Sequence, residues 1–245
     1  MVLRWRDELP GAARGPAAVL ALTAAPGPAA NLGDHVGDDP AAVARAREGV
    51  AAALGLPGER VLYARQVHGR SVAVATGPWP AGPPEDDAIV TDRPGLALAV
   101  LVADCVPVLL ADPERGVVGV AHAGRRGMDE GVVGAALAAM RDLGATRVRA
   151  VLGPSVCGRC YEVPAALRDD VAARHPVTAS VTWTATPALD VAAGVLEQLA
   201  AAGVPARQLP GCTVESPDLG SVRRSGPGAP RWAGLVHLTG AAGPL

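Results

Sequence analysis

Residues 103–127 read ADCVPVLLADPERGVVGVAHAGRRG, and this stretch decides the fold. It contains two short apolar runs, VPVLLAD and GVVGVAHA, separated by turn residues, a pattern typical of strands. Two further runs of the same kind, AIVT and LALAVLVAD, precede it along the chain. Cys105 and His122 each stand at the end of an apolar run. The stretch therefore predicts short strands that carry a cysteine and a histidine at their ends.

Helical segments alternate irregularly with these strands. Asp39 and Pro40 are typical of a helix N-cap and first turn, and Gly55 of its end, so a helix is expected between them. The other expected elements are a strand at 60–68, a surface loop at 78–87, a helix at 128–144, a strand near 147–153, helices around 164–174 and 188–202, and a strand at 232–238. Without a strict βαβ rhythm, the pattern predicts an α/β protein, α+β or layered, with one domain over residues 1–245.

Composition excludes several classes of protein. The 245 residues are 49% hydrophobic, as in globular proteins. All 22 basic residues are arginine, which a G+C-rich genome explains, and the net charge of −2 argues against a nucleic-acid partner. No apolar run approaches the roughly 20 residues of a membrane span. Asp7, Glu8, Pro26 and Pro28 argue against a signal peptide at the arginine-containing N-terminus. Four scattered cysteines predict a reducing, cytoplasmic location.

His68, Cys105 and His122 are candidate metal ligands, because each stands at or beside the end of an expected strand. Thiolate and neutral imidazole suit zinc, and three protein ligands leave a fourth position open, as in catalytic sites. The alternative is that these are ordinary buried residues, since cysteine is among the most buried residue types. The long spacing between the three does not decide between these interpretations.

The sequence CGRC, from Cys157 to Cys160, is a second cysteine motif. A zinc ribbon needs another pair at similar spacing, and only Cys105 and Cys212 remain, far away in the chain. A redox disulfide is the alternative, but no thioredoxin-like context surrounds the motif. The zinc-deaminase pattern is absent too, because no histidine is followed by x-Glu. The role of this pair stays open.

The turn HAGRRG offers a candidate anion site. Gly124 and Gly127 flank Arg125 and Arg126 just before an expected helix, where backbone N–H groups favour an anion. Arg126 would suit phosphate, because its planar guanidinium binds two oxygens at once. A solvated basic turn is the alternative.

These motifs occur in an order that resembles one bacterial family, the laccase-domain family, whose members are described as multi-copper polyphenol oxidases or as purine nucleoside phosphorylases. The resemblance spans roughly residues 20–238 and rests on NLGDHVGDD (31–39), QVHG (66–69), DAIVT (87–91), ADCVPVLLAD (103–112), VAHAGRRG (120–127), LGPSVCGRCYEV (152–163) and the closing CTVESPD…RR…R.

The resemblance implies a single α/β domain similar to a cysteine-hydrolase-like toxin fold. It implies zinc, with copper as the alternative, on His68, Cys105 and His122, and phosphorolysis of adenosine, inosine and methylthioadenosine with some adenosine deamination. The purine nucleoside and phosphate would be small-molecule partners, and Asp104 would orient the site beside the cysteine ligand. The implied substrate- and phosphate-binding residues are Asn31, Arg47, Arg126, Arg223 and Arg224.

The sequence departs from the family pattern where substrate should bind. The family's Trp in HAGWRG is Arg125 here, the usual Asn beside Arg47 is Ala46, and aromatic residues are missing both before NLG and before the RR pair. Stacking of a purine on an aromatic face contributes about 1–3 kcal/mol, so the nucleoside pocket is expected to be altered.

Four-copper oxidase chemistry is not expected, because it needs H-x-H pairs and this chain has none. Two rivals to the phosphorylase remain. A cysteine hydrolase acting on peptidoglycan precursors would use Cys105 as nucleophile and His122 as base. A non-catalytic partner of the cell-division or wall machinery ranks last, because the sequence shows no apolar helix or charge run that marks such a surface.

Overall fold

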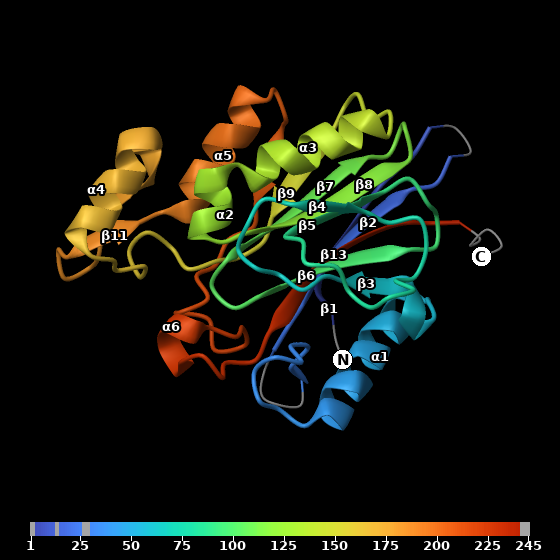
Figure 1. The fold of residues 1–245 in the computed structure, drawn as a ribbon, viewed down its shortest axis with the longest axis horizontal. Helices are drawn as coiled ribbons and strands as arrows, with labels where there is room; N and C mark the ends of the chain where they lie inside the picture. Colours follow the sequence, from blue (N-terminus) through green and yellow to red (C-terminus); the bar gives the residue numbers. More distant parts are fainter. Residues whose placement is uncertain (1–2, 13–14, 26–29, 241–245) are drawn as a thin grey trace.

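Two β-sheets lie face to face in the computed structural model, which describes residues 3–12, 15–25 and 30–240 (Figure 1). The first sheet has the order β1-β2-β13-β6-β3, with bounds Leu3–Leu9, Ala18–Thr23, Trp232–Leu238, Ala97–Val102 and Val61–Tyr63. The second has the order β12-β9-β7-β8-β5-β4, with bounds Ala206–Gln208, Arg149–Leu152, Val106–Asp112, Val117–Ala123, Ala88–Thr91 and Val72–Val74. A two-stranded ribbon pairs β10 (Ala179–Val181) with β11 (Pro187–Leu189).

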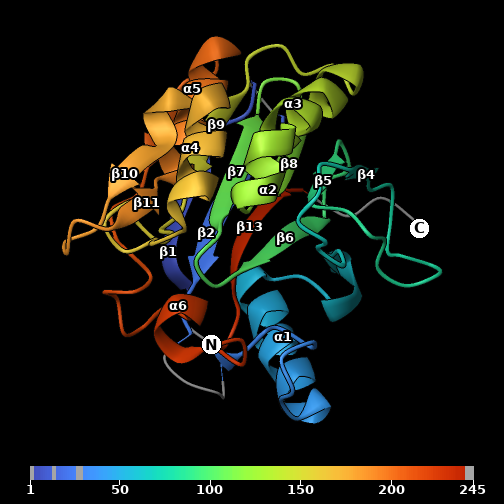
Figure 2. The same cartoon turned by 60° about the vertical axis from the view of Figure 1, so that its left-hand side comes forward.

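Helices cover the outer faces of both sheets (Figure 2). On one side α1 (Pro40–Leu54) packs against the first sheet. On the other side α2 (Arg125–Glu130), α3 (Val132–Asp142) and α5 (Val191–Ala201) pack against the second. The helix α4 (Ala165–Arg174) packs against the ribbon of β10 and β11. The short helix α6 (Val222–Ser225) lies away from these layers. The result is a layered, mixed α/β protein, as the sequence predicts at the level of fold class.

The continuous apolar strands follow from this layering. In β7, Val108 and Leu110 face the helices, whereas Leu109 and Ala111 face the other sheet. Successive strand residues point to opposite faces, so a strand covered on both faces is apolar throughout. All seven residues of β7 and of β8 are buried accordingly.

The expected helices form with small differences at their ends. Asp39 caps α1 by accepting a hydrogen bond from the Ala41 N–H at 3.0 Å, and Gly55 follows in the left-handed conformation, as predicted. The helix expected at 128–144 is two helices, because Gly131, at φ +88°, ends α2 and begins α3. The helix expected at 188–202 begins only at Val191, after Asp190 caps it.

The strand expected at 60–68 is much shorter than predicted. It ends at Tyr63, and the residues after it, including His68, form a loop. His68 therefore does not end a strand. His122 lies in β8 and Cys105 lies between β6 and β7, close to their expected places.

The N-terminal arginine-containing segment is built into the first sheet, where β1 pairs antiparallel with β2. No helix in the described part of the chain is long and apolar enough to cross a membrane.

Close approach of the two sheets depends on Gly234 in β13. A Cβ atom there would lie 2.9 Å from Pro107 Cβ and 3.0 Å from Leu109 Cδ2 of the facing sheet. We expect Gly234→Ala to lower the free energy of unfolding by about 1–3 kcal/mol, because overpacking forces the sheets apart. Chemical denaturation measures the change.

The matched control is Gly134→Ala in α3, where a Cβ meets nothing within 4 Å. This substitution should leave stability unchanged or raise it by up to about 1 kcal/mol, since alanine is the better helix former. Equal effects of the two substitutions would contradict the packing argument.

Candidate metal centre

Three side chains predicted as metal ligands meet at one point of the structure. The donor atoms of His68, Cys105 and His122 all lie within 4.8 Å of one another. His68 Nε2 is 3.9 Å from Cys105 Sγ, and the two imidazole rings stand edge to face with centroids 4.7 Å apart. The structure thus brings together all three residues that the sequence proposes.

The loop that carries His68 is folded around a buried carboxylate. Asp87 accepts hydrogen bonds from the backbone N–H groups of Val67 at 3.2 Å, His68 at 3.0 Å and Gly69 at 2.7 Å. His68 has φ +61°, which is uncommon for a non-glycine residue. Successive N–H groups that converge on one anion hold this conformation.

Gln66 joins the same loop to the first sheet. Its amide donates to the Leu101 carbonyl at 2.8 Å and accepts from the Leu101 N–H at 2.7 Å. The backbone pairing of β3 with β6 ends at Tyr63, and the Gln66 side chain continues it by binding the next part of β6. In the motif QVHG, Gln66 therefore attaches the loop to the sheet, and His68, two residues later, is the candidate metal ligand.

His122 is oriented by the same carboxylate. Its Nδ1 lies 2.8 Å from Asp87 Oδ1, so Nε2 is the nitrogen left to bind a metal. Burial disfavours its charged form, but Cys105 and Asp87 outweigh burial and raise the pKa of His122 to about 9. Burial would likewise raise the pKa of Asp87, yet the bonds from His122 and from the backbone hold it below its ordinary value.

Cys105 follows a residue in an equally unusual conformation. Asp104 has φ +99°, and its carboxylate accepts from the Thr213 hydroxyl at 2.6 Å and from the Arg223 N–H at 2.7 Å. Asp104 therefore fixes the turn between β6 and β7 and does not line the cavity. Burial alone would raise the pKa of the Cys105 thiol, but His122 and His68 lower it to about 6. The thiol is thus readily ionised at neutral pH.

The donor set fits a zinc-like ion. In tetrahedral zinc sites, sulfur and nitrogen ligands lie about 3.5 Å apart, so small side-chain adjustments would bring these three to binding distance. Space for the ligands is provided by Gly124, where a Cβ would lie 2.8 Å from His68 Cδ2 and 3.2 Å from Cys105 Sγ. At Gly127 a Cβ would meet the Gly69 carbonyl at 2.8 Å. The His68 loop packs so closely against HAGRRG that a side chain at Gly124 or Gly127 would collide with its surroundings, which explains why both positions are glycine.

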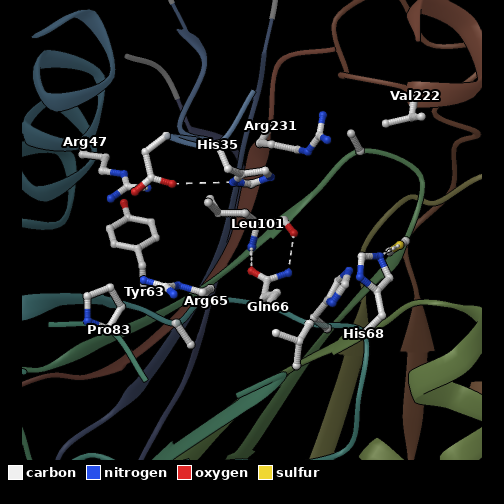
Figure 3. Close-up of a pocket in the computed structure, with 16 residues that line it drawn as sticks. His35, Arg47, Tyr63, Arg65, Gln66, His68, Pro83, Leu101, Val222 and Arg231 are labelled. Atoms are coloured by element: carbon white, nitrogen blue, oxygen red, sulfur yellow. Dashed lines mark hydrogen bonds and ion pairs between the residues drawn. The ribbon is translucent and has the colours of Figure 1, made fainter. Parts of the chain in front are cut away.

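A cavity of about 610 Å³ opens from the three ligands (Figure 3). Figure 3 shows His68 at one end, Arg47 and Tyr63 at the other, and Gln66 between them. Three arginines and one carboxylate line this cavity: Arg47, Arg65 and Arg231, and Asp34. The cavity is therefore positively charged beside the candidate metal centre.

Two of the cavity's arginines are held in place by the protein. Arg47 donates to the Leu32 carbonyl at 3.0 Å, pairs with Asp34 at 3.3 Å and stacks over the Tyr63 ring at 4.4 Å. Arg231 donates to the carbonyls of Ala229 and Pro227. Since a guanidinium has five N–H donors, both keep donors free for a ligand.

Four of the predicted substrate- or phosphate-binding residues do not line the cavity. The Asn31 amide is used by the backbone of Gly33 and Arg231 and by Asp38. The Arg126 side chain is 57% exposed and lies 3.6 Å from Glu130. Asn31 therefore has a structural role, whereas the Arg126 side chain lies in solvent.

The other two are Arg223 and Arg224, and both are engaged with the protein. Arg223 stacks over the Tyr161 ring at 4.5 Å and donates to the Glu162 carbonyl at 2.8 Å. Arg224 donates to four carbonyls, those of Thr213, Val214, Ser216 and Leu219. The RR pair thus holds the chain around 213–219 together, and of the residues predicted to bind substrate or phosphate only Arg47 lines the cavity.

Two residues of this site were missed by reasoning from the sequence, although both lie in recognised motifs. Asp87 begins DAIVT, and Arg231 is the last arginine of the closing motif. An acidic residue opening an apolar strand is a weak signal that could have drawn attention to Asp87. Nothing local marks Arg231.

The departures from the family pattern lie partly outside this cavity. Arg125 does not line it, and Ala46 is buried in α1. Residues 26–29, in the segment before NLG that lacks aromatic residues, lie outside the described residues. Among the residues that line the cavity, Tyr63 carries a phenol ring, and Arg47 covers that ring.

The chain also resembles known proteins along nearly its whole length. The family model described as multi-copper polyphenol oxidoreductase laccase matches residues 21–239. The chain belongs to this family, as the resemblance of its motifs indicates.

Relatives and solved structures agree with this assignment. The chain is 56% identical over 222 residues to a protein named purine nucleoside phosphorylase ORF3 from Streptomyces griseus, covering 89% of this chain and 90% of that one. Its structure is similar to Neisseria meningitidis NMB0706, of family DUF152, with TM-score 0.79, 32% identity, and coverage of 93% of this chain and 96% of that one. YlmD from Geobacillus stearothermophilus gives TM-score 0.81 at 30% identity, covering 93% and 97%.

The Asp87 carboxylate should control metal affinity without binding the metal. Asp87→Asn keeps the size of the side chain but replaces one acceptor oxygen by a donor, which frees the His68 loop and the His122 ring. We expect the affinity for zinc to fall by about 10–100-fold, as for other partners of metal-bound histidines. Competition titration against a chelating dye measures it.

Asp86→Asn is the matched control, because its carboxylate makes no hydrogen bond within the described part of the chain. Its zinc affinity should equal that of the wild type. Equal affinity of the Asp87 variant would show that the carboxylate does not organise the ligands.

Proposed function

We propose that this protein is a metal-dependent purine nucleoside phosphorylase. The observation that carries the proposal is the cluster of His68, Cys105 and His122 at one end of a cavity lined by arginines. A thiolate and two imidazoles are a zinc-type donor set with one open position, and copper is the alternative metal. The names of two similar relatives point to the same reaction class.

Phosphorolysis requires an anion to be held beside the sugar. A phosphate oxygen bonds to C1′ of the ribose while the bond from C1′ to the purine breaks, so positioning dominates the chemistry. Arg47 and Arg231 support this step, because both line the cavity and both are fixed by backbone carbonyls. In our proposal they bind phosphate, in place of Arg126, Arg223 and Arg224.

When bound, a zinc-type ion supplies Lewis acidity and a readily ionised water. Asp87 keeps His122 in the tautomer that presents Nε2, and it holds the His68 loop by three N–H groups. Asp104 anchors the turn that carries Cys105. These contacts preorganise the donors before substrate enters.

The proposal includes the finer expectations of the family. Adenosine, inosine and methylthioadenosine are the proposed substrates, with adenosine deamination as a side activity. Arg47 covers the Tyr63 ring, so this phenol is not the stacking surface that the family's aromatic residues would offer to a purine. We further propose a cytoplasmic location and a single domain over residues 1–245 of the cysteine-hydrolase-like toxin type.

A cysteine hydrolase acting on peptidoglycan precursors is the second candidate. The observation in its favour is the Cys105 thiol, whose pKa of about 6 reflects the two imidazoles beside it. An ionised thiol next to histidine is also the arrangement of a nucleophile and its base. The two candidates differ in whether Cys105 holds a metal or attacks a substrate.

The first test combines metal content with phosphate dependence. We expect about one zinc at the His68–Cys105–His122 site, and release of free purine from adenosine or inosine only when phosphate is present. Cys105→Ala should lose the metal of this site and the activity together, because a thiolate ligand is removed. Elemental analysis and chromatography of the released base measure both.

Alkylation separates the two candidates. If Cys105 holds a metal, iodoacetamide should modify it only after chelation, as mass spectrometry of the peptide will show. Rapid alkylation of the metal-loaded protein, with phosphate-independent turnover, would favour the hydrolase.

The arginine assignment has its own test. Arg47→Met and Arg231→Met should each raise the KM for phosphate by about tenfold or more, since a hydrogen bond to a charged group contributes about 1.5–3 kcal/mol. Arg45→Met, on the exposed face of the same helix as Arg47, is the matched control and should leave KM unchanged. An unchanged KM for phosphate in both cavity variants would move the phosphate site elsewhere.

A further inference from the structure

A second cluster of donor atoms lies outside the cavity. The side chains of Cys157, Cys160, Cys212 and Glu215 place one donor atom each within 4.8 Å of one another. Cys160 Sγ lies 3.5 Å from Glu215 Oε1, and the Cys157 N–H lies 3.4 Å from Cys212 Sγ. Reasoning from the sequence set Cys212 aside as too distant, and the structure corrects that.

Strand pairing brings the two segments together. β12 runs parallel to β9, and beyond the ends of these strands Ser155 and Cys212 form an isolated parallel bridge. The chain from Gly211 onward therefore lies beside the chain from Pro154 onward. Around this bridge Cys157 comes to lie beside Cys212 and Cys160 beside Glu215, each pair 55 positions apart in the sequence.

The two segments have the same pattern and the same local shape. CGRC is C-x-x-C, and CTVE is C-x-x-E at the same spacing. In each, the N–H of the last residue donates to the carbonyl of the first, at 2.9 Å for Cys160 and 3.1 Å for Glu215. Two such turns facing each other form the paired arrangement that a zinc ribbon requires. Glu215 takes the place of a fourth cysteine.

We propose that Cys157, Cys160, Cys212 and Glu215 bind a structural zinc ion. Three thiolates and one carboxylate complete a tetrahedral set, so no position remains open for substrate. This ion would be distinct from the one proposed at Cys105, which has three protein ligands and adjoins the cavity.

The local chemistry supports a cation at this point. All four cysteines of the chain lie within the described residues and are free, so no disulfide uses these sulfurs. The Cys157 N–H already points at Cys212 Sγ, as expected for a ligand sulfur that accepts a supporting hydrogen bond.

The proposed ion would connect the two segments that hold Asp104. From one segment the Val156 N–H donates to the Asp104 carbonyl at 2.9 Å. From the other, the Thr213 hydroxyl donates to the Asp104 carboxylate at 2.6 Å. Since Asp104 precedes Cys105, a bridge between the segments stabilises the turn that presents the cavity's cysteine.

The test is metal stoichiometry in variants that remove one site at a time. Wild-type protein prepared under reducing conditions should contain about two zinc ions per chain, and Cys105→Ala about one. In that variant, cobalt substituted for zinc should show strong charge-transfer absorption of three thiolates in a tetrahedral field. A Cys105→Ala protein without zinc, or with a cobalt spectrum of fewer than three thiolates, would overturn the proposal.

Glu215→Ala removes one proposed ligand of this site and keeps all of its cysteines. It should lower the zinc affinity of this site by about tenfold or more, as expected when a ligand is lost, and lower the melting temperature by several degrees. Glu59→Ala, also an exposed glutamate, is the matched control and should change neither.

Mass spectrometry tests the disulfide alternative on the wild-type protein. Without metal removal, Cys157, Cys160 and Cys212 should resist alkylation, and all three should become reactive when a chelator is added. A disulfide between any two of them in the freshly purified protein, with only one zinc bound, would contradict the proposal whether or not the variants fold.

Discussion

The Asp87 carboxylate binds three backbone N–H groups and one imidazole, and the arrangement of the candidate metal centre depends on it. One buried anion thus holds the His68 loop, whose backbone takes a positive φ, and orients the His122 ring. Asp104 acts similarly at the other ligand, because its bonds to Thr213 and Arg223 fix the turn before Cys105. Two carboxylates outside the ligand set therefore position all three ligands.

The three candidate ligands come from both sheets. His68 follows β3 of the first sheet, His122 lies in β8 of the second, and Cys105 sits on the connection from β6 to β7 that crosses between them. Glycines at the sheet interface and beside the ligands allow the required close approach. The geometry of the candidate metal centre therefore depends on how the two sheets pack. A change that separates the sheets is expected to separate the candidate ligands as well.

Several features of the site were readable from residue type, and others were not. His68, Cys105 and His122 stand out because cysteine and histidine are rare in this chain and lie near apolar runs. The residues that we propose to bind phosphate are harder to find, because arginine is abundant and the chain contains no lysine. Arg224 and Arg231 look alike in the sequence, yet one donates to four backbone carbonyls and the other lines the cavity.

The sequence by itself determined the local elements: the cap of α1 at Asp39, the buried strands β7 and β8, and the family, since each depends on neighbouring residues or on an ordered set of motifs. Tertiary structure alone decided which distant residues meet. Pairing of β12 with β9, followed by the bridge between Ser155 and Cys212, brings Cys212 close to Cys157, 55 residues away. Asp87 meets His122 across 35 residues for a similar reason, because β5 pairs with β8. Strand register is a long-range property, set by which faces both sheets bury, and no short stretch of sequence contains it.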